Sequence, residues 1–150
     1  MGLIFNADQI TERNNGLTFD DVLLMPRHCE ITSRTIPSLK SRITKSYSCE
    51  IPFIAANMDT VTEERMAVAM GELGAVGSLH RFLSPEQQAQ EVKNIIELKK
   101  NNPHLLAAAS VGVKIDGMRR ADLLVDAGVE ILTLDIAHGD SVMMLEVLDY

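Results

Sequence analysis

Polar and charged side chains follow four short apolar runs of this sequence, at the point where each run ends. A guanidinium group in such a place attracts phosphate, and a carboxylate can orient ribose hydroxyls, so these residue types suit a nucleotide site. If the runs are parallel strands, their carboxyl ends share one edge of a sheet and the side chains after them converge. The residues are Asn57, Met58 and Asp59, then His80 and Arg81, then Ser110, Gly112 and Lys114, and last Asp135, His138 and Gly139.

Four of these residues have a structural explanation as well as a binding one. Asp59 is explained equally well by stabilising the start of the helix that follows it. His80 fits a packed histidine at a strand end better than a proton carrier. Arg81 is the better binding candidate, although most such residues form surface ion pairs. Asp135 either orients ribose hydroxyls or caps the next turn, and we favour binding.

The apolar runs alternate with amphipathic patterns, which predicts four strand–helix units. Ser84, Pro85 and Gln87 form a capping box with proline at the first helical position of the second helix. Gly74 and Gly128 are predicted to end the first and third helices. The predicted strands are residues 51–56, 75–80, 105–111 and 130–135.

The helix after the first strand is predicted to begin at a second capping box. Thr60 and Glu63 have the spacing at which a hydroxyl and a carboxylate satisfy the free amides of a first turn. Asp116 is predicted to cap the third helix, and Asp140 or Ser141 the fourth. The predicted buried face of the first helix, which spans residues 61–73, is Met66, Met70 and Leu73.

The repetition of strand and helix predicts an α/β fold with a parallel sheet. The strands are continuously apolar, as expected when both faces of a sheet are buried. Two arrangements fit, an open doubly wound sheet and part of a (β/α)8 TIM barrel. No glycine-rich fingerprint follows a strand, which disfavours the first. A barrel needs about 250 residues, so we predict that residues 51–150 form the first half of one. Residues 1–50 are predicted to be an irregular segment that packs on it.

The composition excludes several classes of protein. The net charge of −7 over 150 residues argues against nucleic acid as a partner. No apolar run approaches the roughly 18 residues of a membrane span, and no signal peptide is evident, so we predict a cytoplasmic protein without a membrane partner. Cys29 and Cys49 are too few for a disulfide scaffold and follow no predicted strand. We therefore predict no catalytic cysteine and no metal site within these residues.

Five motifs in a fixed order carry a family resemblance. They are L-T-F-D-D-V-L-L-M-P (17–26), A-A-N-M-D-T-V-T-E (55–63), L-H-R-F (79–82), S-V-G-V-K (110–114) and L-D-I-A-H-G-D-S (134–141). Together they resemble the amino-terminal half of the IMP dehydrogenase/GMP reductase family. The resemblance implies a (β/α)8 barrel, usually a homotetramer, that binds a purine mononucleotide and a nicotinamide cofactor at its mouth.

Within the family, the resemblance is closer to GMP reductase. Residues 100–104 form a bare junction where IMP dehydrogenases usually carry inserted CBS domains, and Asn57 before Met58 resembles the reductases. The V-T-E after M-D-T and the complete L-T-F-D-D-V-L-L resemble the dehydrogenases, some of which lack the insertion. The resemblance thus implies an NADPH-dependent GMP reductase, with an NAD-dependent IMP dehydrogenase lacking CBS domains as the alternative.

The resemblance also implies roles for individual residues. Arg81 stands where many GMP reductases have lysine, and its permanent charge puts a proton-transfer role in doubt. Ser33 and Arg34 match a pair that, in animal-type reductases, reaches cofactor bound to a neighbouring subunit. The implied substrate-binding residues are Asn57 and Met58. The implied cofactor-binding residues are Ser33, Arg34, Arg81, Asp135, Ile136 and Ala137.

The implied reaction is covalent catalysis by a cysteine. The thiolate attacks C2 of the purine, ammonia leaves from GMP, and NADPH delivers hydride to give IMP; in the dehydrogenase, NAD accepts hydride and water releases XMP. The family's cysteine follows the sixth strand, outside residues 1–150, so these residues alone are expected to be inactive. Alternatives of other classes are a non-catalytic half barrel that binds purine nucleotide and a different phosphate-binding barrel such as a flavoenzyme. The sequence leaves a monovalent-cation requirement open.

Overall fold

The computed structural model describes residues 8–9 and 17–150. The chain divides into two compact units, Met1–Pro37 and Ser38–Tyr150. The described part of the first unit is mostly irregular. Its best-defined feature is a turn in which the Asp21 carboxylate accepts hydrogen bonds from the Thr18 amide, at 2.9 Å, and from the Thr18 hydroxyl, at 3.0 Å.

The second unit contains the predicted parallel sheet and its alternating helices. An antiparallel hairpin precedes them, formed by β1 (Ser41–Arg42) and β2 (Ser48–Cys49). The sheet has the order β3-β4-β5-β6, with β3 (Ile54–Ala55), β4 (Val76–Leu79), β5 (Ala108–Val111) and β6 (Ile131–Leu134). The helices are α2 (Glu64–Glu72), α3 (Pro85–Lys99), α4 (Ile115–Asp126) and α5 (Val142–Asp149).

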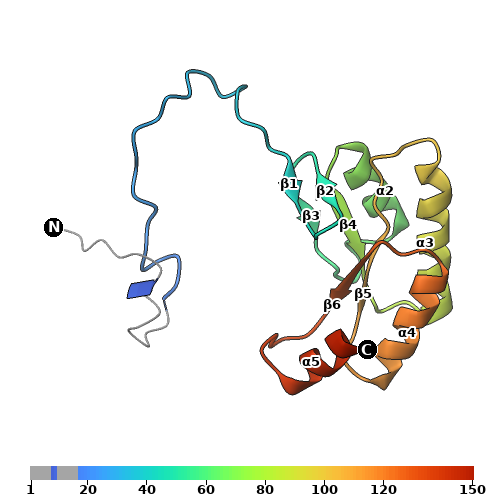
Figure 1. Cartoon of the computed structure of the whole chain (residues 1–150). Helices are drawn as coiled ribbons and strands as arrows, with labels where there is room; N and C mark the ends of the chain where they lie inside the picture. The colour runs from blue at the N-terminus through green and yellow to red at the C-terminus, as the bar shows by residue number, and fades with distance from the viewer. Residues whose placement is uncertain (1–7, 10–16) are drawn as a thin grey trace. The chain divides into compact units, whose positions relative to one another are not determined.

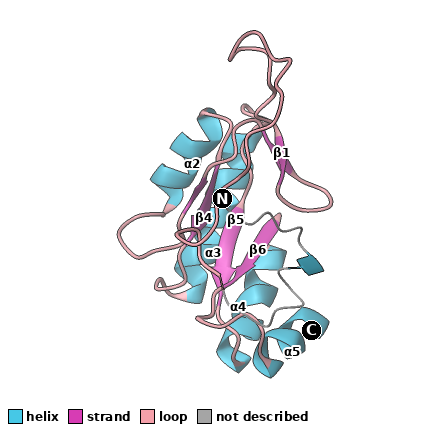
Figure 2. Ribbon diagram, turned by 90° about the vertical axis from the view of Figure 1, so that its left-hand side faces the viewer, coloured by secondary structure: helices cyan, strands magenta, loops and turns pink. Residues whose placement is uncertain are grey.

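Helices α2, α3 and α4 all cover the same face of the sheet (Figures 1 and 2). A doubly wound sheet carries helices on both faces, whereas a barrel carries them only outside. The strands are also all parallel and in sequence order. Both features confirm the α/β prediction and fit the first four units of a (β/α)8 barrel. In the described residues the four strands form an open sheet, not a closed barrel.

Apolar residues pack on both faces of the sheet. The larger cluster lies between sheet and helices and includes Leu79 and Ala109, both 0% exposed. A smaller cluster joins Cys49 of the hairpin to Val76 and Ala108. Because neighbouring strand residues point to opposite faces, the hairpin covers the amino-terminal part of the face that the helices leave open.

The first strand is shorter than predicted. Pro52 has no N–H to donate, and the Phe53 N–H bonds to the Ile51 carbonyl at 2.8 Å in a local turn, so the ladder begins only at Ile54. Both outer strands expose apolar side chains, with Ile54 58% and Leu132 37% exposed.

The predicted capping box at the start of α2 is wrong. Thr60 lies in a turn, with a positive φ of 61°, and the helix begins after Glu63, whose side chain makes no capping hydrogen bond. Instead, the Glu64 amide donates to the Glu91 carboxylate of α3 at 3.1 Å. A neighbouring helix thus supplies the acceptor that a local side chain was expected to provide.

The predicted buried face of α2 is also wrong. Ala67 and Gly71 are buried, whereas Met70 is only half-buried and Met66 and Leu73 are 40% and 70% exposed. The reason is close packing on the sheet, because a Cβ added to Gly77 of β4 would lie 2.6 Å from the Cα of Ala67. Helix and strand backbones therefore meet directly, and only small residues fit between them.

The predicted N-terminal caps are present in α3 and α5 but not in α4. The predicted capping box of α3 is confirmed, because the Gln87 amide donates to Ser84 Oγ at 3.2 Å and the Ser84 amide donates to Gln87 Oε1 at 3.1 Å. Ser141 caps α5 through its hydroxyl. The cap predicted at Asp116 is wrong, since Lys114 is the N-cap of α4 and Asp116 lies within its first turn.

Gly117 offers a test of the packing at the start of α4. A Cβ added there would lie 2.0 Å from the Gly112 carbonyl oxygen. Alanine is the better helix former by about 1 kcal/mol, but the backbone would have to move. We expect Gly117→Ala to lower the free energy of unfolding of the complete protein by about 1–3 kcal/mol.

Urea denaturation measures this change. The matched control is Gly139→Ala, because a Cβ at Gly139 meets nothing within 4 Å. The control should change the free energy of unfolding by less than about 0.5 kcal/mol. Equal stability of the two variants would contradict the close approach of Gly117 to the preceding loop.

Candidate nucleotide site

The turn between β3 and α2 carries Asn57 and Met58, the two residues predicted to contact substrate. Asn57 is half-buried and Met58 is 59% exposed. The Met58 carbonyl accepts the amides of Val61 at 3.1 Å and Thr62 at 3.2 Å, which closes the turn. The backbone here is fixed, while the Met58 side chain remains accessible.

Two threonines with opposite surroundings complete this turn. Exposed Thr60 has a φ of 61°, which is an outlier for a β-branched residue. Thr62 is 0% exposed, and its Oγ1 donates to the Ala56 carbonyl at 2.6 Å. The Thr62 carbonyl in turn accepts the His80 amide at 3.1 Å. The turn is therefore tied to the end of β3 and to the end of β4, and sequence patterns alone did not identify Thr62.

His80 is held inside the structure and not presented to a ligand. It is 1% exposed, and its Nδ1 accepts the Phe82 amide at 3.1 Å. The ring proton must then lie on Nε2, which donates to Glu63 Oε1 at 3.2 Å, with Asp59 Oδ1 at 3.9 Å. Both ring nitrogens have partners, so the geometry favours the packed-histidine explanation.

The structure brings Arg81 and Asp135 together across the intervening strand β5. Arg81 Nε donates to Asp135 Oδ2 at 2.7 Å, and the side chains are 37% and 32% exposed. The Arg81 guanidinium carbon also lies 5.1 Å from the Phe82 ring centroid. Partly exposed ion pairs of this kind contribute no more than about 1 kcal/mol. A ligand with comparable contacts can therefore displace either partner.

The remaining predicted cofactor residues lie in two places. Ile136, half-buried, and Ala137, exposed, follow Asp135 in the loop after β6. Ser33 and Arg34 belong to the first unit and are exposed there, with Ser33 Oγ 2.9 Å from the hydroxyl of Thr35.

A buried amide on α3 holds the carboxyl ends of β4 and β5. Gln88 is 0% exposed, and its Nε2 donates to the carbonyls of His80 at 3.1 Å and Ser110 at 2.9 Å. Its Oε1 accepts from Arg120 Nη1 at 2.9 Å. Burial is the main cause that lowers the pKa of Arg120 from its usual value; Asp116 raises it, and nearby Arg81 lowers it further. Arginine nevertheless stays protonated at neutral pH.

The role of Gln88 had a signal in the sequence. Gln88, Val92 and Ile95 stand at i, i+4 and i+7, and all three are buried. A glutamine on the buried stripe of a helix needs hydrogen-bond partners inside the protein. Ser110, near the end of the third predicted strand, lies within β5, where its hydroxyl donates to the Leu79 carbonyl at 2.9 Å.

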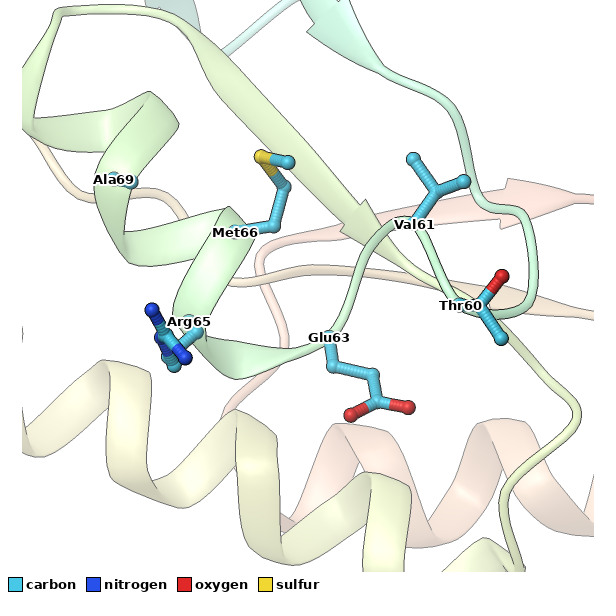
Figure 3. Close-up of a pocket in the computed structure, with 6 residues that line it drawn as sticks. All are labelled: Thr60, Val61, Glu63, Arg65, Met66 and Ala69. Carbon is cyan, nitrogen blue, oxygen red and sulfur yellow. The ribbon is translucent and has the colours of Figure 1, made fainter.

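A hollow of about 430 Å³ lies beside the first part of α2 and the turn before it (Figure 3). It does not include the predicted substrate or cofactor residues. Its lining residues are Thr60, Val61, Glu63, Arg65, Met66 and Ala69. Asn57, Met58, Arg81 and Asp135, which follow the strands outside this hollow, are all at least partly exposed.

Two features are absent from residues 8–9 and 17–150, the part of the chain that the structure describes. No cluster of three or more His, Cys, Asp or Glu residues there could hold a metal ion. No helix in that part is long and apolar enough to cross a membrane. Cys29, exposed, and Cys49, buried, are both free thiols.

A family model described as "IMP dehydrogenase / GMP reductase domain" matches residues 16–150. The chain therefore belongs to the IMP dehydrogenase/GMP reductase family, as the five motifs indicated. Its members are oxidoreductases that act on purine nucleotides with a nicotinamide cofactor.

Curated relatives carry both family names. The inosine-5'-monophosphate dehydrogenase of Nitrosopumilus maritimus (strain SCM1) is 50% identical over 84 residues, which cover 56% of this chain and 18% of the relative. That of Cryptosporidium parvum is 36% identical over 171 residues, covering 89% and 42%. The GMP reductase of Leishmania donovani is 42% identical over 80 residues, covering 53% and 16%. The chain spans less than half of the length of these relatives.

The alignment with the C. parvum enzyme also shows a difference in length. The alignment has 171 positions, which is more than the 150 residues of this chain, although it covers only 89% of the chain. That relative must therefore have residues inserted between segments that match this chain.

Glu91 gives a pH-dependent prediction for the start of α2. Burial is the main cause that raises the pKa of its carboxyl above the usual 4.5; the charges of Glu63 and Glu64 also raise it, while the Glu64 amide and His80 lower it. A raised folded pKa means that the stability contributed by the neutral carboxyl is present at low pH and lost as pH rises through the folded pKa.

We expect the stability of the complete wild-type protein, relative to its Glu91→Gln variant, to fall over the pH range that runs upward from the usual 4.5 through the raised pKa of Glu91. Glutamine keeps an oxygen that can accept the Glu64 amide but carries no charge. Denaturation across this range measures the difference, and Glu97→Gln, an exposed position on the same helix, controls for the loss of one negative charge. If the stability of the wild type relative to Glu91→Gln rose with pH instead, the charged form of Glu91 would be the stabilising one, which would contradict the prediction.

Proposed function

We propose that the complete protein containing this chain is an NADPH-dependent GMP reductase, which converts GMP to IMP and ammonia. Family membership supports the coarser assignment, an oxidoreductase of purine nucleotides. The observation that carries the finer proposal is Asn57 directly before Met58, in a closed turn at the carboxyl edge of the sheet. This pair resembles the reductases.

IMP dehydrogenase is the second candidate, because most of the matched curated relatives bear that name. Overall identity does not favour either reaction strongly. Over 80 residues, the chain is 48% identical to the dehydrogenase of Bacillus subtilis (strain 168) and 42% identical to the reductase of L. donovani. The dehydrogenase candidate would lack CBS domains and use NAD.

In the proposed site, this chain supplies binding groups and not the nucleophile. Asn57 and Met58 would line the purine, and Asp135 would orient ribose hydroxyls of the cofactor after separating from Arg81, which faces the same ligand. Ile136 and Ala137 would lie against the cofactor, and Ser33 and Arg34 would reach the cofactor of a neighbouring subunit in a homotetramer. The cofactor supplies hydride chemistry, and the attacking cysteine would come from outside residues 1–150. Residues 51–150 would then be the first half of the barrel, and residues 1–50 a segment packing on it.

A paired assay of the complete protein separates the two reactions. With GMP and NADPH, the reductase should consume the reduced cofactor, seen as falling absorbance. With IMP and NAD, it should produce no reduced cofactor. Reduction of NAD with IMP, and no loss of NADPH with GMP, would show the dehydrogenase reaction instead. No turnover in either mixture would contradict the enzyme assignment.

Asp135→Ala tests the proposed cofactor contact. We expect the KM for the cofactor to rise about tenfold, the equivalent of roughly 1.4 kcal/mol, because a charge-assisted hydrogen bond is lost. Unfolding stability should fall by no more than about 1 kcal/mol, since the pair with Arg81 is partly exposed. Asp126→Ala, at an exposed position of α4, is the control. An unchanged KM would leave Asp135 with only its ion-pair role.

A further inference from the structure

The turn at residues 57–62 contains a strained backbone position and is held by several hydrogen bonds. Thr60 is the non-glycine residue with positive φ in the described chain. A β-branched side chain in this conformation costs free energy, and such residues persist only where the surrounding structure holds them there. Thr62, two residues later, makes the hydrogen bonds that hold the turn.

Thr62 is the residue that fixes the turn. It is 0% exposed although it stands between exposed Val61 and exposed Glu63. Its hydroxyl reaches back to the Ala56 carbonyl at 2.6 Å, and its own amide donates to the Met58 carbonyl at 3.2 Å. The bond to Ala56 closes a short loop that contains Asn57 and Met58, and the bond to Met58 holds the second half of that loop.

His80, the residue after β4, also holds Thr62 in place. The His80 amide donates to the Thr62 carbonyl at 3.1 Å, and His80 Nε2 donates to Glu63. His80 is itself buried, and the Gln88 amide donates to its carbonyl. The turn is thus connected to helix α3 by hydrogen bonds that run from Thr62 to His80 and from His80 to Gln88.

We propose that Thr62 is a positioning residue, which holds Asn57 and Met58 in the conformation that receives the purine nucleotide. The inference rests on the proposed function and adds to it a residue that does not contact the ligand. A turn ordered before binding avoids the entropy cost of ordering it on the ligand, so its restraint contributes directly to affinity.

Thr62→Val tests this inference in the complete protein. Valine has nearly the same shape but lacks the hydroxyl, so it removes the hydrogen bond to the Ala56 carbonyl with little change in packing. Titration calorimetry with IMP and with GMP should give a Kd about tenfold higher than in the wild type for the nucleotide that binds. The amides of residues 61 and 62 should exchange faster with solvent, while those of α3 keep their protection.

Two further variants separate positioning from general destabilisation. Thr62→Ser keeps the hydroxyl and should bind nucleotide within about twofold of the wild type. Thr133→Val makes the same substitution at a strand residue whose hydroxyl lies 3.1 Å from Ser78 Oγ, away from the turn, and should leave the Kd unchanged.

The outcomes distinguish this inference from the proposed function. Wild-type protein that binds neither IMP nor GMP would overturn the proposed function, and this inference with it. Wild-type protein that binds nucleotide while Thr62→Val binds it equally well would overturn the inference alone. It would also be overturned if Thr62→Ser bound as weakly as Thr62→Val, or if Thr133→Val weakened binding to the same extent.

Discussion

The buried side-chain amide of Gln88 is the constraint on which the carboxyl edge of this sheet depends. A buried amide must find partners, because an unsatisfied polar group costs about 1–3 kcal/mol. Gln88 finds them in the carbonyls where β4 and β5 end, and in the guanidinium of Arg120. The two strand ends are therefore fixed at one level, and the segments that follow them start from a rigid base.

Two groups of side chains depend on that base. On one side, His80 and Thr62 hold the turn that carries Asn57 and Met58. On the other, Arg81 leaves the end of β4 and pairs with Asp135 at the end of β6. The first group is buried and closed by hydrogen bonds, whereas the second is half-exposed and can exchange its partners. A fixed turn suits recognition of a purine, and an exchangeable ion pair suits a cofactor that binds and leaves.

Local sequence signals predicted two helix starts correctly, those of α3 and α5, but did not predict the contacts between segments far apart in the chain. The capping box of Ser84 and Gln87 is local, and it was predicted correctly. The same spacing at Thr60 failed because buried Thr62 holds the turn in another conformation, and a carboxylate from α3 caps the helix. The alternation of strands and helices predicted the fold class, and the lack of a glycine-rich fingerprint favoured a barrel; the structure agrees, since α2, α3 and α4 cover one face of the sheet.

A crystal structure of the complete protein with a purine mononucleotide and a nicotinamide cofactor is the most direct measurement of the central claim. The claim is that the carboxyl edge of β3–β6 binds both ligands. We expect the purine to lie against Asn57 and Met58, with the turn unmoved, and a cofactor ribose to lie on Asp135, with the bond from Asp135 to Arg81 broken or shared. Ligands bound elsewhere, with the Arg81–Asp135 pair intact and the turn out of contact, would contradict it.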